Sequence, residues 1–276
     1  MARVDAFFAL NYKDIDFNFY SRNYESERFV DGGGTEWDIL HVYSTFDTAL
    51  SHYGWDFTLN ANGFVNGGTV EAIAEWVKDP ATEQYIAYFG IAGIDVDITS
   101  IFDVAQTESQ KDDQALLRQV LSGKDRILLS DFDDTMMGYN GNDKIYGYAG
   151  RDNLNGGKGK DQLFGGNDND ILRGSSGDDV IRGGKGRDKE YGGSGEDRFV
   201  FKTGDDKAII MDFDARGSVH DVLDLRGLAS VRNWSDLKNN HMSKDGKDVE
   251  IDAGGGDVIV LKGVSLGDLD KGDFLI

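Results

Sequence analysis

The C-terminal half of the chain contains a nonapeptide repeat. From Gly138 it reads GYNGNDKIY, GYAGRDNLN, GGKGKDQLF, GGNDNDILR, GSSGDDVIR, GGKGRDKEY and GGSGEDRFV. An aspartate recurs every nine residues from Asp125 to Asp197, and an apolar residue follows two positions later in every repeat but the one with Glu190. Such a fixed period indicates a solenoid, because a unit this small buries a core only by stacking on its neighbours.

Each nonamer divides into six turn residues and a three-residue strand. Glycine permits the positive φ angles that the turn needs, and the middle strand residue points inward. The inward series is Ile127, Met136, Ile145, Leu154, Leu163, Leu172, Ile181, Glu190 and Phe199. Two nonamers make one turn of a coil. We therefore predict an all-β fold built around a right-handed parallel β-roll over residues 123–200.

The segments on either side of the roll differ from it. Residues 107–122 (TESQKDDQALLRQVLS) have a leucine stripe and a capping box from Thr107 to Gln110, which predict a short helix. We expect it to cap the roll, since a terminal repeat must be covered; an independent surface helix is the alternative.

Residues 1–106 are predicted to form an N-terminal β-rich module. Polar and apolar residues alternate in 15–19, 37–43 and 55–59, as is typical of half-buried strands. The segment 69–77 fits either a helix or a hairpin with 85–91, and the hairpin is favoured.

Residues 201–276 are predicted to form a C-terminal β cap. Its expected strands are 208–211, 222–225, 249–251 and 258–261, and residues 235–238 suggest one helical turn.

The repeat chemistry favours calcium. Calcium takes six to eight oxygens from carboxylates and backbone carbonyls, and each turn offers one carboxylate with carbonyls aimed inward. Transition metals prefer His or Cys, which the repeat lacks. Magnesium is disfavoured because all-protein cages rarely meet its strict octahedron. One turn supplies half a site, and the turn stacked on it supplies the rest.

These motifs resemble the RTX, or hemolysin-type, nonapeptide proteins of the type I secretion class over about residues 123–200. The tail resembles the C-terminal module of serralysin-like proteins in Asp197-Arg-Phe-Val-Phe, Val222-Leu-Asp-Leu and the final Asp273-Phe-Leu-Ile. The resemblance implies a secreted, extracellular protein of a Gram-negative bacterium, exported by the type I secretion apparatus through an uncleaved C-terminal signal.

The resemblance also implies a ligand scheme in which each ion lies between stacked turns that are two repeats apart. The aspartate pairs would be 134–152, 143–161, 152–170, 161–179, 170–188 and 179–197, hence about six Ca²⁺ ions. The implied metal-binding residues are Asp134, Gly138, Asn140, Asp143, Gly147, Ala149, Asp152, Gly156, Gly157, Lys158, Gly159, Asp161, Gly165, Gly166, Asn167, Asp168, Asp170, Gly174, Ser175, Ser176, Gly177, Asp179, Gly184, Gly186, Asp188, Gly193, Gly195 and Asp197.

Some residues depart from the repeat pattern. Asp168 replaces the fourth-position glycine, and Tyr139 and Tyr148 replace the second. Glu190 occupies an inward apolar position, where an unpaired carboxylate is costly. We expect that the coil opens there, or that Glu190 faces solvent or a metal near the C-terminal module.

No enzyme motif stands out. None of the four histidines has the His-Glu-x-x-His spacing of zinc proteases, and Gly174-Ser-Ser-Gly-Asp178 is a repeat turn rather than a lipase motif. Asp212-x-Asp214-x-Arg216-Gly217 lacks the acid that closes an EF-hand loop and is assigned to a turn. We predict no catalytic residues and no organic cofactor.

An aromatic cluster in the N-terminal module comprises His41, Tyr43, His52, Tyr53 and Trp55. It fits a sugar platform, a haem site or the ordinary filling of a β-module. We expect the module to attach the protein to a polysaccharide or a cell surface. The alternative is a small extracellular hydrolase of polysaccharide or peptide with its active site in residues 1–106.

Charge limits the partners. The chain has 50 acidic and 29 basic residues and a net charge of -21, which disfavours nucleic acid and anionic membranes as partners. No apolar run is long enough for a transmembrane segment. Residues 1–122 hold 20 acids and 7 bases, whereas residues 123–200 hold 15 and 12. Most of the net acidity therefore lies outside the roll.

Overall fold

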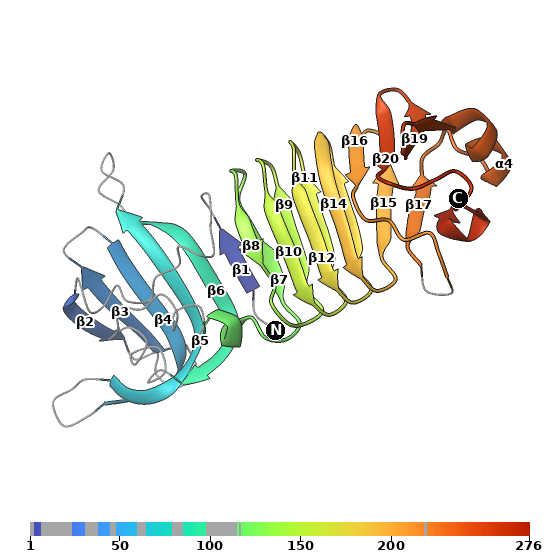
Figure 1. Cartoon of the computed structure of the whole chain (residues 1–276). Coiled ribbons are helices and arrows are strands. Elements are labelled where there is room, and N and C mark those ends of the chain that lie inside the picture. Colours follow the sequence, from blue (N-terminus) through green and yellow to red (C-terminus); the bar gives the residue numbers. More distant parts are fainter. Residues whose placement is uncertain are drawn as a thin grey trace. The chain divides into compact units, whose positions relative to one another are not determined.

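The computed structural model describes residues 115, 117–217 and 220–276 with their side chains, and six strands nearer the N-terminus by their backbone. The chain divides into two units, Met1–Ser122 and Gly123–Ile276 (Figure 1). In the described part of the chain, no helix has the length and apolar character needed to cross a membrane.

The described strands of the first unit form an antiparallel sheet in the order β2-β3-β4-β5-β6-β1. They are β1 (Arg3–Ala6), β2 (Tyr24–Val30), β3 (Asp38–Ser44), β4 (Thr48–Leu59), β5 (Val65–Lys78) and β6 (Tyr85–Asp97). In β5 and β6, Ile73 lies opposite Ile91 and Val77 opposite Ile86, which confirms the predicted hairpin. The strand predicted at 15–19 lies outside the described residues.

The predicted helix is described only near its end. Residue 115 and residues 117–120 are helical, and Leu117 and Leu121 are buried. Residues 107–114 and 116 lie outside the described part, so the capping role stays a prediction.

The second unit begins with the roll, whose strands alternate between two sheets. Sheet A runs β7-β9-β11-β13-β15-β17-β21 and sheet B runs β8-β10-β12-β14-β16-β20-β19-β18. The roll strands are β7 (Arg126–Leu128), β8 (Thr135–Met137), β9 (Lys144–Tyr148), β10 (Asn153–Lys158), β11 (Gln162–Gly166), β12 (Ile171–Ser176), β13 (Val180–Gly184), β14 (Arg187–Ser194) and β15 (Arg198–Lys202). Partners lie two repeats apart in parallel register, for example Leu154 opposite Leu172. The parallel β-roll is therefore confirmed.

The roll core is the predicted inward series. All its members from Ile127 to Phe199 are buried, Glu190 among them. Most roll strands exceed the predicted three residues because their pairing continues into the turn, as where Gly157 lies opposite Ser175 and Gly166 opposite Gly184. Stacked glycine turns thus keep their backbone groups hydrogen-bonded, as buried backbone requires.

The C-terminal residues extend both sheets. Sheet B adds β16 (Lys207–Ile210) and β20 (Asp257–Leu261) in parallel, then β19 (Asp248–Gly254) and β18 (Met242–Asp245) antiparallel. Sheet A adds β17 (Val222–Gly227) and β21 (Phe274–Leu275). The helical elements are α4 (Trp234–Asp236), η2 (Leu237–His241) and η3 (Lys271–Asp273). The predicted C-terminal strands and helical turn are thus present.

Candidate metal centres

The repeat aspartates form two rows, one along each edge of the roll. The first row, before the sheet A strands, contains Asp125, Asp143, Asp161, Asp179 and Asp197. The second row, before the sheet B strands, contains Asp134, Asp152, Asp170 and Asp188. Every one of these side chains is at most 2% exposed. Nine carboxyl groups buried in two lines call for a physical explanation, because charged groups are seldom buried without partners.

In seven of these carboxyl groups, those from Asp143 to Asp197, one oxygen ties two turns together. Asp161 Oδ1 accepts the backbone N–H of Asp143 at 2.8 Å, and Asp179 Oδ1 accepts that of Asp161 at 2.7 Å. The same contact, always two repeats apart, recurs between 125 and 143, 134 and 152, 152 and 170, 170 and 188, and 179 and 197. The aspartates therefore hold the register of the coil.

The other oxygen of the same carboxyl groups has no hydrogen-bond partner. This applies to the buried Oδ2 atoms of Asp143, Asp152, Asp161, Asp170, Asp179, Asp188 and Asp197. A buried polar atom without a partner costs about 1–3 kcal/mol, and more if it is charged. Its repetition at seven equivalent positions fits a row of oxygens that bind cations.

A glycine five residues before each aspartate from Asp143 to Asp197 makes room for this oxygen. A Cβ atom at Gly147 would lie 2.2 Å from Asp152 Oδ2 and 2.5 Å from the Gly165 carbonyl oxygen. At Gly174 it would lie 2.2 Å from Asp179 Oδ2 and 2.7 Å from the Gly192 oxygen. The first-position glycine is therefore required by a close approach of oxygen atoms from two successive turns.

Burial raises the pKa values of these carboxyl groups. The pKa rises to about 8 for Asp143 and Asp170 and to about 6 for Asp161. It rises to about 7 for Asp152, Asp179, Asp188 and Asp197. Loss of hydration is the main cause, and the hydrogen bond from the backbone opposes it. A cation beside the rows would remove the cost of ionising them.

The donor set fits a hard cation. Among the described residues no three His, Asp or Glu side chains gather at one point, so backbone carbonyls must supply most of the ligands. Third-position carbonyls accept one hydrogen bond within the roll, as Lys158 O does from Gly141 N–H at 2.7 Å. Second-position carbonyls do the same, as Tyr148 O does from Asn167 N–H. Each carbonyl keeps a second lone pair, and oxygen-only sites suit Ca²⁺.

The turn positions impose their backbone conformation on whatever residue they hold. Tyr139, Tyr148 and Ser175 in second position have φ of 69°, 75° and 85°, and Asp168 in fourth position has 74°. The structure therefore keeps the turn geometry at every departure from glycine. The other predicted ligand residues lie in the same turns: Gly138, Asn140, Ala149, Gly156, Gly157, Gly159, Gly165, Gly166, Ser176, Gly177, Gly184, Gly186, Gly193 and Gly195.

Both rows have distinct ends. At the start of the second row, Asp134 Oδ2 accepts the Ser130 N–H and hydroxyl, each at 2.8 Å. At the end of the first row, Asp221 Oδ1 accepts the Asp197 N–H at 3.0 Å and its Oδ2 accepts the Asp214 N–H at 2.8 Å. Asp221 was not predicted from the sequence because its separation from Asp197 is longer than two repeats, although Leu223 follows it as in a repeat.

Glu190 does not open the coil and does not face solvent, contrary to two of the expectations above. It is 2% exposed, opposite Leu172 and Ile210 in the sheet. Its Oε1 accepts the Gly183 N–H at 2.6 Å. The pairing of β13 with β15 ends at Ile181 and Phe199. The Gly183 N–H lies beyond that pairing, and Glu190 accepts its hydrogen bond instead. Burial raises the pKa of Glu190 to about 8, which keeps it mostly protonated at neutral pH.

Two other predictions have different outcomes. Asp212–Gly217 is a turn, as expected: Asp212 accepts the N–H groups of Gly192 and Gly193, and Asp214 accepts that of Arg216. The aromatic cluster lies on β3 and β4, but its side chains are outside the described part, so its sugar, haem and packing interpretations stay predictions.

The repeat matches a known family. The model of the RTX calcium-binding nonapeptide repeat matches residues 129–163 and 164–199. Comparison with curated proteins gave no match.

Two solved structures with partial similarity to this chain were also found. One is the extracellular lipase LipA from Serratia marcescens, with 15% identity and a TM-score of 0.31 over 56% of this chain and 38% of the lipase. Another is the AlgE6R3 subunit of the Azotobacter vinelandii mannuronan C5-epimerase, with 22% identity and a TM-score of 0.21 over 56% of this chain and 78% of that one. The chain thus spans little more than a third of the lipase. By the family match, residues 129–199 of this protein are RTX calcium-binding nonapeptide repeats.

Proposed function

We propose that this protein is a secreted calcium-binding β-roll whose repeat region folds when calcium becomes available outside the cell. The observation that supports it best is the line of buried Asp Oδ2 atoms without hydrogen-bond partners. These oxygens lie beside carbonyl oxygens of the next turn, and calcium is the cation that such oxygen sets prefer.

The ions would lie between stacked turns, in the six aspartate pairs named above. Each inner aspartate then serves two pairs: Asp161 would belong to 143–161 and 161–179. Its Oδ1 already contacts the Asp143 backbone, whereas its Oδ2 lies 2.3 Å from the place of a Cβ on Gly156. Shared ligands of this kind would couple neighbouring sites, so we expect cooperative binding.

The magnitude of the switch follows from linkage. Weak extracellular calcium modules have dissociation constants of about 10⁻⁴–10⁻³ M. A tenfold excess of calcium over the dissociation constant contributes about 1.4 kcal/mol per site, or about 8 kcal/mol for about six sites. This is comparable with the whole stability of an ordinary domain. Without calcium, the buried carboxyl groups and the ordering of many glycines both oppose folding.

Secretion through the type I apparatus would use the unfolded form. The final residues that resemble an export signal are part of the folded cap: Phe274 lies opposite Leu223, and Asp270 and Asp273 form a capping box. A signal recognised in extended form must therefore be read before the cap folds. Scarce calcium in the cytosol would delay that folding.

The N-terminal module would attach the protein to a polysaccharide or a cell surface. Its antiparallel sheet supports a binding role no more strongly than the alternative of a small hydrolase. A glycan array and a panel of peptide and polysaccharide substrates, applied to the full protein, separate the two.

A calcium titration followed by far-UV circular dichroism tests the folding switch. We expect a cooperative gain of β-structure as calcium replaces chelator. An equal magnesium titration is the control and should give little change at the same concentrations. A repeat region that is already fully folded in excess chelator would contradict the proposal.

A further inference from the structure

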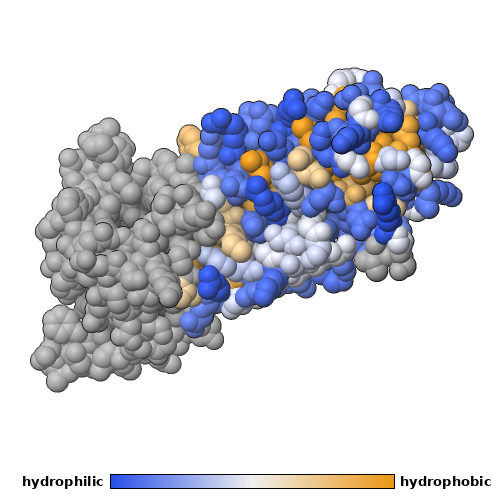
Figure 2. Space-filling model, viewed as in Figure 1, coloured by the Kyte–Doolittle hydropathy of each residue, from blue (hydrophilic) through white to orange (hydrophobic). Residues whose placement is uncertain are grey.

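The outer surface of the roll is basic, although the chain as a whole is acidic. Residues 123–200 hold 15 acidic residues, of which ten are buried, and 12 basic residues. The outer surface therefore carries five acidic and 12 basic side chains. The outward positions of β9, β13 and β15 illustrate this: they include Lys144, Arg182 and Arg198. Figure 2 shows the largely hydrophilic character of the visible face of this unit. An anionic partner therefore fits the roll itself.

A groove of about 470 Å³ lies on the outer face of sheet A. Its lining includes an aromatic stack: the rings of Tyr146 and Phe164 are 4.9 Å apart and inclined by 14°, and those of Tyr146 and Tyr148 are 6.3 Å apart. Arg126 lies 5.8 Å over the ring of Tyr146. This volume is in the range of small-ligand sites.

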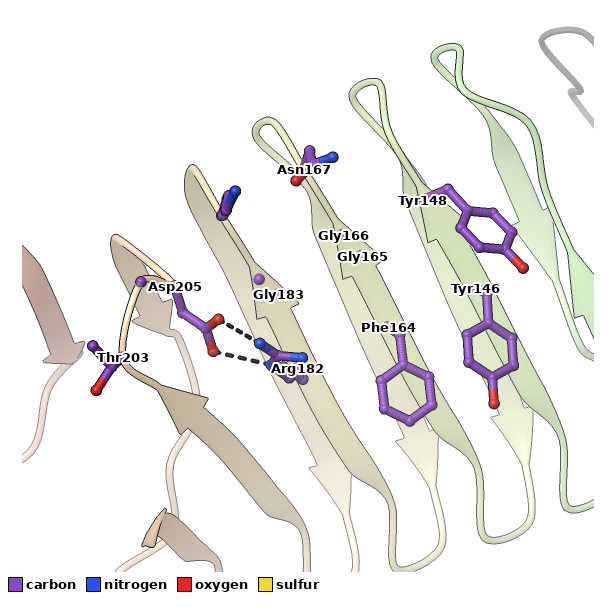
Figure 3. A pocket seen from close by; sticks show the side chains of 13 residues that line it. Tyr146, Tyr148, Phe164, Gly165, Gly166, Asn167, Arg182, Gly183, Thr203 and Asp205 are labelled. Atoms are coloured by element: carbon purple, nitrogen blue, oxygen red, sulfur yellow. Dashed lines mark hydrogen bonds and ion pairs between the residues drawn. The ribbon is translucent and has the colours of Figure 1, made fainter. Parts of the chain in front are cut away.

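One face of Phe164 is open to the groove. Arg182, which occupies the equivalent position on the next strand, turns away from Phe164 and forms a bidentate ion pair with Asp205 at 2.6 and 3.0 Å (Figure 3). Asn167, Lys185 and Thr203 also line the groove. The site thus combines an exposed ring face, hydrogen-bonding groups and a cation, Lys185, that has no described acid within ion-pair distance.

Tyr148 is held at a conformational cost. Its φ of 75° is in the region that glycine favours, and its side chain is 46% exposed. Burial therefore does not account for a tyrosine at this position. Strained residues of this kind often mark binding sites.

We propose that this groove binds an acidic polysaccharide. A sugar ring would stack on the open face of Phe164 beside Tyr148, its hydroxyl groups would meet Asn167 and Thr203, and a carboxylate would pair with Lys185. Asp205 neutralises Arg182, so among the described residues that line the groove Lys185 supplies the free positive charge. This favours a polymer with widely spaced carboxylates over nucleic acid, whose phosphates are densely spaced.

Calorimetry of the full, calcium-saturated protein with hyaluronan oligosaccharides tests this site. We expect Phe164→Ala and Lys185→Glu each to weaken binding about tenfold, which corresponds to about 1.4 kcal/mol. Tyr148→Gly should also weaken binding while the melting temperature stays equal or rises, because glycine tolerates this φ. Dextran, which is neutral, should bind much more weakly.

Matched variants control for general effects. Tyr191→Ala removes an aromatic ring from the same repeat position on sheet B, and Lys189→Glu reverses an exposed charge on the same strand; both should bind as the unaltered protein does. Equal binding by all variants, or a clear preference for single-stranded DNA that the same groove variants abolish, would overturn the assignment. A calcium titration of each variant shows whether a loss of sugar binding is merely a loss of the roll.

Discussion

Replacing Asp161 by asparagine tests the shared-ligand arrangement most directly. The asparagine can still accept the Asp143 N–H through its oxygen, as Asp161 Oδ1 does at 2.8 Å. It loses the charge and places an amide nitrogen where the unpartnered Oδ2 lies. The variant therefore keeps the register contact and removes a ligand from two of the proposed calcium pairs.

The expected effects have opposite signs in calcium and in chelator. With tenfold excess calcium, losing two sites costs about 3 kcal/mol, which lowers the melting temperature by about 6–12 °C for a unit of this size. In chelator at pH 7, the native pKa of about 6 against 3.8 when unfolded means that folding the carboxyl group costs about 3 kcal/mol. Asparagine removes this cost, but its buried unpaired amide group costs about 1–3 kcal/mol. In chelator the variant should therefore be as stable as the unaltered protein or more stable.

Thermal unfolding in both media, followed by circular dichroism, measures the two effects. Asp134→Asn is the informative comparison: Asp134 belongs to one proposed pair, and its Oδ2 already accepts the Ser130 N–H and hydroxyl. In the Asp134→Asn variant, an amide nitrogen at the Oδ2 position cannot accept the Ser130 N–H and hydroxyl. This variant should therefore lose stability both in calcium and in chelator. If Asp161→Asn has the calcium midpoint and slope of the unaltered protein, the shared-ligand reasoning fails.

Three further predictions follow from the same geometry. First, burial raises the repeat Asp pKa values to about 6–8 in the metal-free roll. The stability of that roll is therefore fullest below about pH 4 and is lost as pH rises through 6–8. Circular dichroism in chelator should show more β-structure at pH 5 than at pH 8, and no difference would contradict the burial argument. Second, Gly147→Ala should raise the calcium needed for folding, because its Cβ would meet Asp152 Oδ2 and the Gly165 oxygen, whereas Gly204→Ala, with nothing within 4 Å, should change only overall stability. Third, the Glu190→Leu variant should be less stable than Glu190→Gln by about 1–3 kcal/mol in chemical denaturation at pH 7. The reason is that leucine leaves the Gly183 N–H without an acceptor. Equal stability of the two variants would show that this hydrogen bond is unimportant.

The central part of the fold could be predicted from the sequence because its rules are local. Alternation around Ile145 and Leu154 and the recurring aspartates specify a strand, a turn and an inward residue in each nonamer, and the two-repeat register follows from stacking two of them. The hydrogen bond from each Asp backbone to the next Asp carboxyl group could not be predicted, since it depends on how the turns face each other.

The features that escaped prediction are contacts between residues with irregular spacing. Asp221 closes the first row at a distance of 24 residues, and Asp205 draws Arg182 away from Phe164 across 23 residues. The strand at 15–19 and the aromatic cluster on β3 and β4 stay predictions for a different reason: residues 15–19 and the side chains of the cluster lie outside the described part.

The carboxyl groups at two ends of the aspartate rows differ from those inside the rows. A regular aspartate leaves its Oδ2 for a shared cation and so invites another turn to stack, whereas Asp134 Oδ2 accepts the Ser130 N–H and hydroxyl, and both oxygens of Asp221 accept backbone N–H groups. Inside the roll, Glu190 also satisfies a backbone group. Its carboxyl group accepts the Gly183 N–H, which lies where β13 and β15 separate. Satisfied carboxyl groups thus stand at the start of the second row and beyond the end of the first. Because backbone N–H groups of the chain satisfy both oxygens of Asp221, we expect substitutions of Asp221 to destabilise the C-terminal cap equally with and without calcium.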